Sequence, residues 1–128
     1  MLNEVKYKVI FDIVNTMSKR ITFDETFRFD DEGFSGNIYI DPNDSLGFNA
    51  LVVDVHGAHP HKQILNGNTR VYIVAYGTGT FTLDGQEHKA ERGDMFVIEA
   101  GSEYAYSGSM QLFEFNVSPG NSFGDQLL

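Results

Sequence analysis

Two histidines in residues 57–62 have the types and spacing that most directly suggest chemistry. His59 and His61 flank Pro60, and residues two apart in an extended strand lie on the same face. Imidazole titrates near neutral pH and can move a proton next to a carbonyl, so the two are candidate catalytic residues, an acid–base pair. Two plainer interpretations stay open: the histidines point into a pocket without reacting, or they are exposed in a turn beside Pro60.

One arginine and three tyrosines form a second group of candidates. A buried guanidinium without a partner is costly, so Arg70 needs a counter-charge. That counter-charge is either a glutamate of the protein or a ligand's carboxylate or phosphate, and pairing with a buried glutamate would rule out the ligand. Tyrosine offers a ring for stacking and a hydroxyl for hydrogen bonding, as a sugar requires. The predicted ligand-binding residues are Arg70, Tyr72, Tyr104 and Tyr106, and the glutamates that could pair with Arg70 are Glu99, Glu103 and Glu114.

Alternating apolar and polar residues predict short β-strands around these candidates. Residues 4–14 alternate, residues 48–56 and 70–76 are rich in β-branched side chains, and a glycine turn at 77–79 separates 70–76 from a further strand at 80–83. Asp84-Gly85 predicts a tight hairpin, because both residues tolerate positive φ. No window carries the apolar stripe of an amphipathic helix over three turns. About nine or ten strands bounded by turns predict a closed antiparallel barrel or jelly roll.

The chain is expected to form a single domain. Its 128 residues suffice for a core without disulfides. The expected organisation is N-terminal strands in residues 1–47, the core in 48–118 and a tail in 119–128.

Composition excludes several classes of function. The net charge of −9 disfavours nucleic acid and anionic lipid as partners. The absence of cysteine removes disulfides, thiolate nucleophiles and cysteine metal sites. No apolar run is long enough for a membrane span and the amino terminus does not resemble a signal peptide, so a cytoplasmic protein is expected.

Residues 57–117 resemble the cupins, which are small barrels with an interior pocket. The segment 57–61, GAHPH, is similar to the His-x-His of their first motif, and 70–79, RVYIVAYGTG, to the strand and glycine turn that end it. Gly93-Asp94 and the later segment 100–104, AGSEY, are similar to the second motif. The resemblance implies an all-β, cupin-type double-stranded β-helix (jelly-roll barrel), here with an N-terminal strand extension.

The same resemblance bears on metal binding. Metal-binding cupins use the two histidines, a glutamate on the next strand and a histidine after the second turn. The glutamate position falls on Arg70 and the last histidine position on Tyr104. Arginine cannot ligate a divalent cation and would repel it. No cofactor is therefore expected; the alternative is a divalent metal such as Zn, Fe, Ni or Mn held by His59 and His61.

Several functions remain open from the sequence. The favoured one is a metal-free cupin that binds a small polar ligand, a sugar or carboxylate, in its pocket. GAHPHK also resembles a stretch of the sugar-nucleotide ketoisomerases, which implies a carbohydrate isomerase or epimerase using His59 and His61. A metal-dependent dioxygenase or isomerase and a non-catalytic structural barrel are further alternatives. A homodimer is expected, with the strand at 4–14 pairing to a second barrel.

Overall fold

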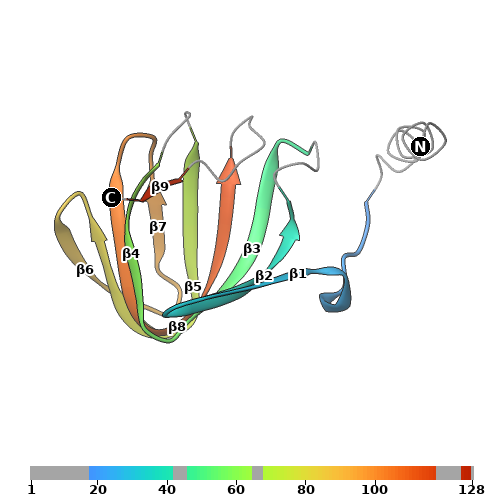
Figure 1. Ribbon diagram of the computed structural model, residues 1–128, viewed down its shortest axis with the longest axis horizontal. Helices are drawn as coiled ribbons and strands as arrows, with labels where there is room; N and C mark the ends of the chain where they lie inside the picture. Colours follow the sequence, from blue (N-terminus) through green and yellow to red (C-terminus); the bar gives the residue numbers. More distant parts are fainter. Residues whose placement is uncertain (1–17, 42–45, 65–67, 118–124, 128) are drawn as a thin grey trace.

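The computed structural model describes residues 18–41, 46–64, 68–117 and 125–127. Figure 1 shows these residues as a curved arrangement of antiparallel strands that encloses an interior. Among the described residues, one 3₁₀ turn, η1 (Phe23–Glu25), precedes the strands. The strand predicted at residues 4–14 and most of the tail at 119–128 lie outside the described residues. The strands are β1 (Phe27–Asp31), β2 (Phe34–Ile40), β3 (Phe48–Val55), β4 (Ala58–Ile64), β5 (Thr69–Leu83), β6 (Gln86–Glu91), β7 (Met95–Ile98), β8 (Glu103–Val117) and β9 (Asp125–Leu127).

Two long strands, β5 and β8, form the centre of the barrel. The path of paired strands runs β1-β2-β3-β8-β4-β9, and β5 pairs with β6, β7 and β8. The second half of β8 lies between β3 and β5, whereas its first half lies between β4 and β5. All of these pairings are antiparallel, as the strand pattern predicted.

Glycines allow β5 and β8 to continue through a bend where the sequence analysis expected strands to end. The predicted turn at 77–79 lies inside β5, and residues 103–117 form one continuous strand, β8. Gly77 and Gly108 have positive φ values of 88° and 136°. A Cβ on Gly108 would lie 2.5 Å from the Cα of Gly79, so only glycine permits this approach of the two strands. The chain therefore bends here without breaking the ladder.

The interior side chains of three neighbouring strands line up in rows. Alternation along β5 buries Arg70, Tyr72 and Val74 on one side of the strand. Across β3, β8 and β5 the inward rows are Asn49–Asn116–Arg70, Leu51–Glu114–Tyr72 and Val53–Leu112–Val74. The row Asn49–Asn116–Arg70 is polar and the row Val53–Leu112–Val74 is apolar. Arg70 and Glu114 therefore lie at the boundary between the polar end of the interior, called the floor below, and the apolar core.

The hairpin predicted at Asp84-Gly85 is confirmed. Asp84 and Gly85 have φ values of 48° and 82°, and Leu83 pairs with Gln86 across the turn. Within the described ranges, no helix has the length and hydrophobicity that a membrane crossing requires.

Candidate functional site

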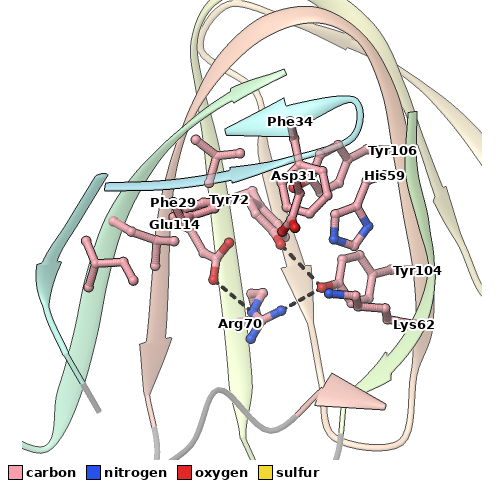
Figure 2. A pocket seen from close by; sticks show the side chains of 13 residues that line it. Phe29, Asp31, Phe34, His59, Lys62, Arg70, Tyr72, Tyr104, Tyr106 and Glu114 are labelled. Atoms are coloured by element: carbon pink, nitrogen blue, oxygen red, sulfur yellow. Dashed lines mark hydrogen bonds and ion pairs between the residues drawn. The ribbon is translucent and has the colours of Figure 1, made fainter. Parts of the chain in front are cut away.

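A cavity of about 250 Å³ occupies the barrel interior (Figure 2). Its side chains come from β1 and β2 at one wall, β3, β5 and β8 at the back, and β4 at the opposite wall. The amide of His56 donates a hydrogen bond to the carbonyl of Gly33 (2.9 Å), which fixes the β1–β2 turn against the loop after β3. The lining residues are Phe29, Asp31, Phe34, Ile38, Leu51, Val53, His59, Lys62, Arg70, Tyr72, Tyr104, Tyr106 and Glu114.

His59 is buried in the wall of this cavity among aromatic rings. Its imidazole stacks on Tyr106 at a centroid distance of 4.3 Å and on Tyr104 at 5.2 Å, and it contacts Phe34 at 4.7 Å. Burial, reinforced by the positive charge of Lys62, lowers its pKa to about 3, so the ring is neutral at pH 7. Among the described residues, no hydrogen-bond partner reaches its Nδ1 atom. A buried polar atom without a partner is costly, and a ligand in the cavity would satisfy it.

His61 does not join His59, contrary to the expectation that the two share a face. His59 pairs with Tyr106 of β8, and the next paired residue is Lys62 with Tyr104, because a β-bulge interrupts β4 between them. The bulge moves the alternation by one residue. His61 is consequently exposed, and Lys62 lines the cavity in its place. The Nζ atom of Lys62 lies 5.9 Å from the centroid of the Phe34 ring.

Arg70 is paired with a buried carboxylate of the protein. Its Nε atom lies 3.3 Å from Oε2 of Glu114 and donates a hydrogen bond to Oδ1 of Asn116. The Asn116 amide in turn donates to Glu114 (2.9 Å), and Nη1 of Arg70 donates to the Tyr104 hydroxyl (2.6 Å). Of the three glutamates proposed as partners, Glu114 is therefore the one in contact. The expectation that Arg70 offers its charge to an anionic ligand is wrong, because Glu114 already neutralises it.

The three predicted tyrosines all line the cavity. The hydroxyl of Tyr72 donates to that of Tyr104 over 3.5 Å, which connects it to Arg70 (Figure 2). Burial, together with the negative charge of Glu114, raises the pKa of Tyr72 and that of Tyr106 well above the usual value. Both phenols are therefore neutral at physiological pH and can act as hydrogen-bond donors or acceptors.

The fixed charges around the cavity cancel. Among the described residues that line it, Lys62 and Arg70 are cations, Asp31 and Glu114 are carboxylates, and His59 is neutral. An adjoining open groove of about 760 Å³ shares Asp31, Phe34, His59 and Lys62 with the cavity and continues outward over Gly57. These shared residues mark the mouth.

Three charged residues that line the cavity, Lys62, Asp31 and Glu114, were not predicted to do so, although Glu114 was a candidate partner of Arg70. Lys62 was not identified because its inward position depends on the β4 bulge, and no pattern in residues 58–64 predicts that bulge. Asp31 belongs to an acidic stretch that is typical of a solvated turn, and it is indeed exposed. A residue count through the alternating run 112–117 places Glu114 on the buried side, and this signal could have selected it.

Comparison with known proteins places this architecture among solved folds. No family model matches the sequence, and no curated protein matches it either. Among solved structures, Pac13 of Streptomyces, described as a nucleoside dehydratase, matches 88% of this chain and 92% of its own at 20% identity with a TM-score of 0.75. Ectoine synthase from P. lautus (12% identity, 88% and 90% covered, TM-score 0.70) and the Schizosaccharomyces pombe Cnp3 cupin domain (13%, 76% and 72%, 0.61) are also similar. The chain has the cupin fold.

The cupin metal position is filled by residues that do not fit a divalent cation. The expected ligand positions carry His59, Arg70 and Tyr104, and the β4 bulge gives the remaining inward place to Lys62. Two of these four are cations, and Arg70 already occupies the carboxylate that faces it. No group of three or more His, Asp or Glu side chains within the described part of the chain is arranged to hold an ion. The donor set does not fit a metal, and the expectation of a metal-free protein stays a prediction.

Proposed function

We propose that this protein binds a small, uncharged, hydroxyl-bearing molecule of the sugar or nucleoside class in the barrel cavity, without a bound metal. The observation that carries the proposal is the Nδ1 atom of His59, which is buried and has no described partner in a side chain that lines the cavity. A neutral imidazole can accept a hydrogen bond from a ligand hydroxyl or donate one, according to its tautomer. The surrounding aromatic rings offer apolar faces to a sugar or a base.

The charge balance of the cavity favours an uncharged ligand over a carboxylate. A carboxylate would need a cation that the protein does not already neutralise. Arg70 is paired with Glu114, and Lys62 shares the mouth with Asp31. Transferring an anion into a cavity of zero net charge costs free energy that no ion pair returns. The ligand is therefore expected to be neutral.

The likeness to Pac13 supports a nucleoside or sugar. Pac13 was solved with uridine in variants that replace one histidine and two tyrosines. In that chain the first tyrosine lies thirteen positions after the histidine, and the second tyrosine lies thirty-four positions after the first. His59, Tyr72 and Tyr106 have the same two spacings, and all three line the cavity.

The alternatives from the sequence have less support. An isomerase that passes a proton between His59 and His61 needs both in the cavity, but His61 is exposed. A pKa of about 3 also makes His59 a weak base, so the geometry supports hydrogen bonding more than proton abstraction. A purely structural barrel would fill its interior with side chains rather than leave a cavity.

The test is a ligand screen with a matched pair of histidine variants. Uridine, ribose and glucose are compared with uridine monophosphate and glucuronate by thermal shift and calorimetry. A ligand at a hundredfold excess over Kd stabilises the native state by about 2.7 kcal/mol. At least one uncharged ligand should bind, more tightly than its charged analogue. His59→Phe keeps the aromatic ring and removes Nδ1, so binding should fall at least tenfold, whereas His61→Phe should bind as wild type. Failure of every uncharged ligand, or equal loss in both variants, would overturn the proposal.

A further inference from the structure

The open groove at the mouth of the cavity continues the cavity to the surface but has a different lining. Both hollows are lined by Asp31, Phe34, His59 and Lys62. The residues that line the groove but not the cavity are Glu32, Gly33, Gly57, Ala58 and Pro60. One wall of the groove is therefore the turn between β1 and β2, and the other is the turn before β4 together with the start of β4. A molecule seated in the cavity can extend into the groove through the shared mouth.

Two glycines hold these two walls against each other. A Cβ atom on Gly57 would lie 2.9 Å from the Cα of Gly33, and one on Gly33 would collide with the carbonyl oxygen of Ala58. Only glycine permits so close an approach of two backbones. The amide of His56 donates a hydrogen bond to the carbonyl of Gly33, and the amide of Gly108 donates one to the carbonyl of Gly57, both over 2.9 Å. The groove is therefore a fixed part of the fold.

The acidic turn of residues 31–32 gives the groove a negative charge. Asp31 and Glu32 are both exposed, and neither forms an ion pair or a hydrogen bond with another described residue. Among the described residues that line the groove, Lys62 is the cation, and His59 is neutral at pH 7. Two carboxylates against one ammonium leave a net charge of −1, on a protein whose total is −9. This field attracts a cation and repels an anion.

His59 connects the groove to the ligand proposed for the cavity. Its side chain lines both hollows, the residue is only 5% exposed, and its Nδ1 atom has no described partner. A ligand hydroxyl that satisfies this atom lies at the junction of the two hollows. A substituent next to that hydroxyl can then reach the groove. Because the groove is open, a charged substituent there keeps part of its hydration and avoids the cost of entering the cavity.

We propose that the groove is a subsite for a positively charged amino substituent on the sugar or nucleoside, with Asp31 and Glu32 as the residues that select it. The inference rests on the proposed function and extends it. The enclosed part of the ligand remains uncharged, and the charge is carried by the substituent outside the cavity. A phosphate or carboxylate at the same place would meet the two carboxylates and bind more weakly.

The experiment is calorimetry on the full chain with pairs of probes that differ by one amino group. The pairs are uridine with 5′-amino-5′-deoxyuridine and glucose with glucosamine, at about pH 6.5, where both amines are protonated. In at least one pair the amine should bind roughly fivefold more tightly than its parent, as partly exposed charge pairs allow. The N-acetylated amines are uncharged and should not show this gain. The gain should also shrink between about 50 mM and about 500 mM salt, because salt screens exposed charges.

The variants measure the ratio of the Kd of the parent to that of the amine. Glu32→Gln is the decisive variant, because Glu32 lines the groove and not the cavity, and it should lower the ratio about twofold. The double variant Asp31→Asn, Glu32→Gln should abolish the preference. Lys62→Met removes the opposing ammonium and should raise the ratio. Glu87→Gln is the matched control: it removes the same charge from an exposed residue of β6 outside the groove and should leave the ratio unchanged.

The subsite and the proposed function fail in different ways. If the parents bind but neither amine binds more tightly, the subsite is overturned and the proposed function stands. The same conclusion follows if the preference survives in the double variant, or if Glu87→Gln lowers the ratio as much as Glu32→Gln does. If none of the parents and none of the amines binds, the proposed function is overturned and the subsite with it.

Discussion

Buried polar groups on the floor of the cavity and on its wall differ in whether their hydrogen bonds are satisfied. On the floor, Arg70, Glu114, Asn116 and Tyr104 satisfy one another through an ion pair and hydrogen bonds. On the wall, His59 is equally buried but keeps a ring nitrogen without a described partner. Arg70, Glu114 and Asn116 come from neighbouring positions on β5 and β8, so the register of these two strands brings them together.

This difference distinguishes the groups that stabilise the fold from the group that is available to a ligand. A saturated network contributes to the native state but offers little to a ligand, because its hydrogen-bonding capacity is already used. An unsatisfied atom weakens the free protein and strengthens a complex that supplies its partner. Arg70 attracted attention in the sequence because of its charge, whereas His59 is the group whose bonding is incomplete.

The largest expected effect comes from breaking the floor network. Glu114→Gln removes the carboxylate and leaves the guanidinium of Arg70 buried without its counter-charge, which should lower the free energy of unfolding by about 3–5 kcal/mol. The double variant Arg70→Met, Glu114→Leu removes both charges and should lose much less than the sum of the two single changes. Urea denaturation measures these differences.

An exposed ion pair provides the control for this experiment. Lys89 and Glu91 approach to 3.2 Å on the surface of β6, with both side chains more than half exposed. Glu91→Gln should therefore change stability by less than about 1 kcal/mol. If Glu114→Gln is equally mild, the floor is not the stabilising network described above.

Much of the fold was predictable because local rules specify it. Alternation grouped the residues of β5 by side, the resemblance to the cupins indicated which side faces inward, and Asp84-Gly85 marked a hairpin that the structure contains. Strand continuity was not predictable in the same way. Gly77 and Gly79 were predicted to form a turn, but tertiary pairing between β5 and β8 uses them, together with Gly108, for a bend.

The candidate site was only partly predictable for a related reason. His59, Arg70 and the three tyrosines were found from their residue types together with the resemblance to the cupin motifs. The exchange of His61 for Lys62 depends on a one-residue bulge that pairing with β8 creates. Glu114 lies forty-four positions from Arg70, and only the register between β5 and β8 shows that they meet.

The second-largest expected effect is on stability in acid, and it follows from the burial of His59 in the wall of the cavity. The pKa of His59 falls from 6.5 to about 3 on folding, so the unfolded chain binds a proton more tightly in that interval. Stability is therefore fully present above about pH 6.5 and decreases as pH falls toward 3, by up to about 1.4 kcal/mol per pH unit. Between pH 7 and pH 4.5 the wild type should lose about 2 kcal/mol more than His59→Phe in urea denaturation. His61→Phe should follow the wild type, and equal losses in all three proteins would contradict this account.

The smallest effect tests the contribution of Lys62 to the state of His59. Burial is the first cause of the lowered pKa and the charge of Lys62 is the second, so removing that charge should raise the titration midpoint of His59 without restoring 6.5. Lys62→Met keeps the length of the side chain and removes its charge, and we expect an upward change that is small beside the effect of burial. Nuclear magnetic resonance titration of the imidazole measures the midpoint directly. Because the charge of His61 is the weakest of the causes, His61→Gln should move the midpoint less than Lys62→Met does. If the two variants act equally, or if Lys62→Met leaves the midpoint unchanged, the bulge does not bring the Lys62 charge to bear on the wall of the cavity.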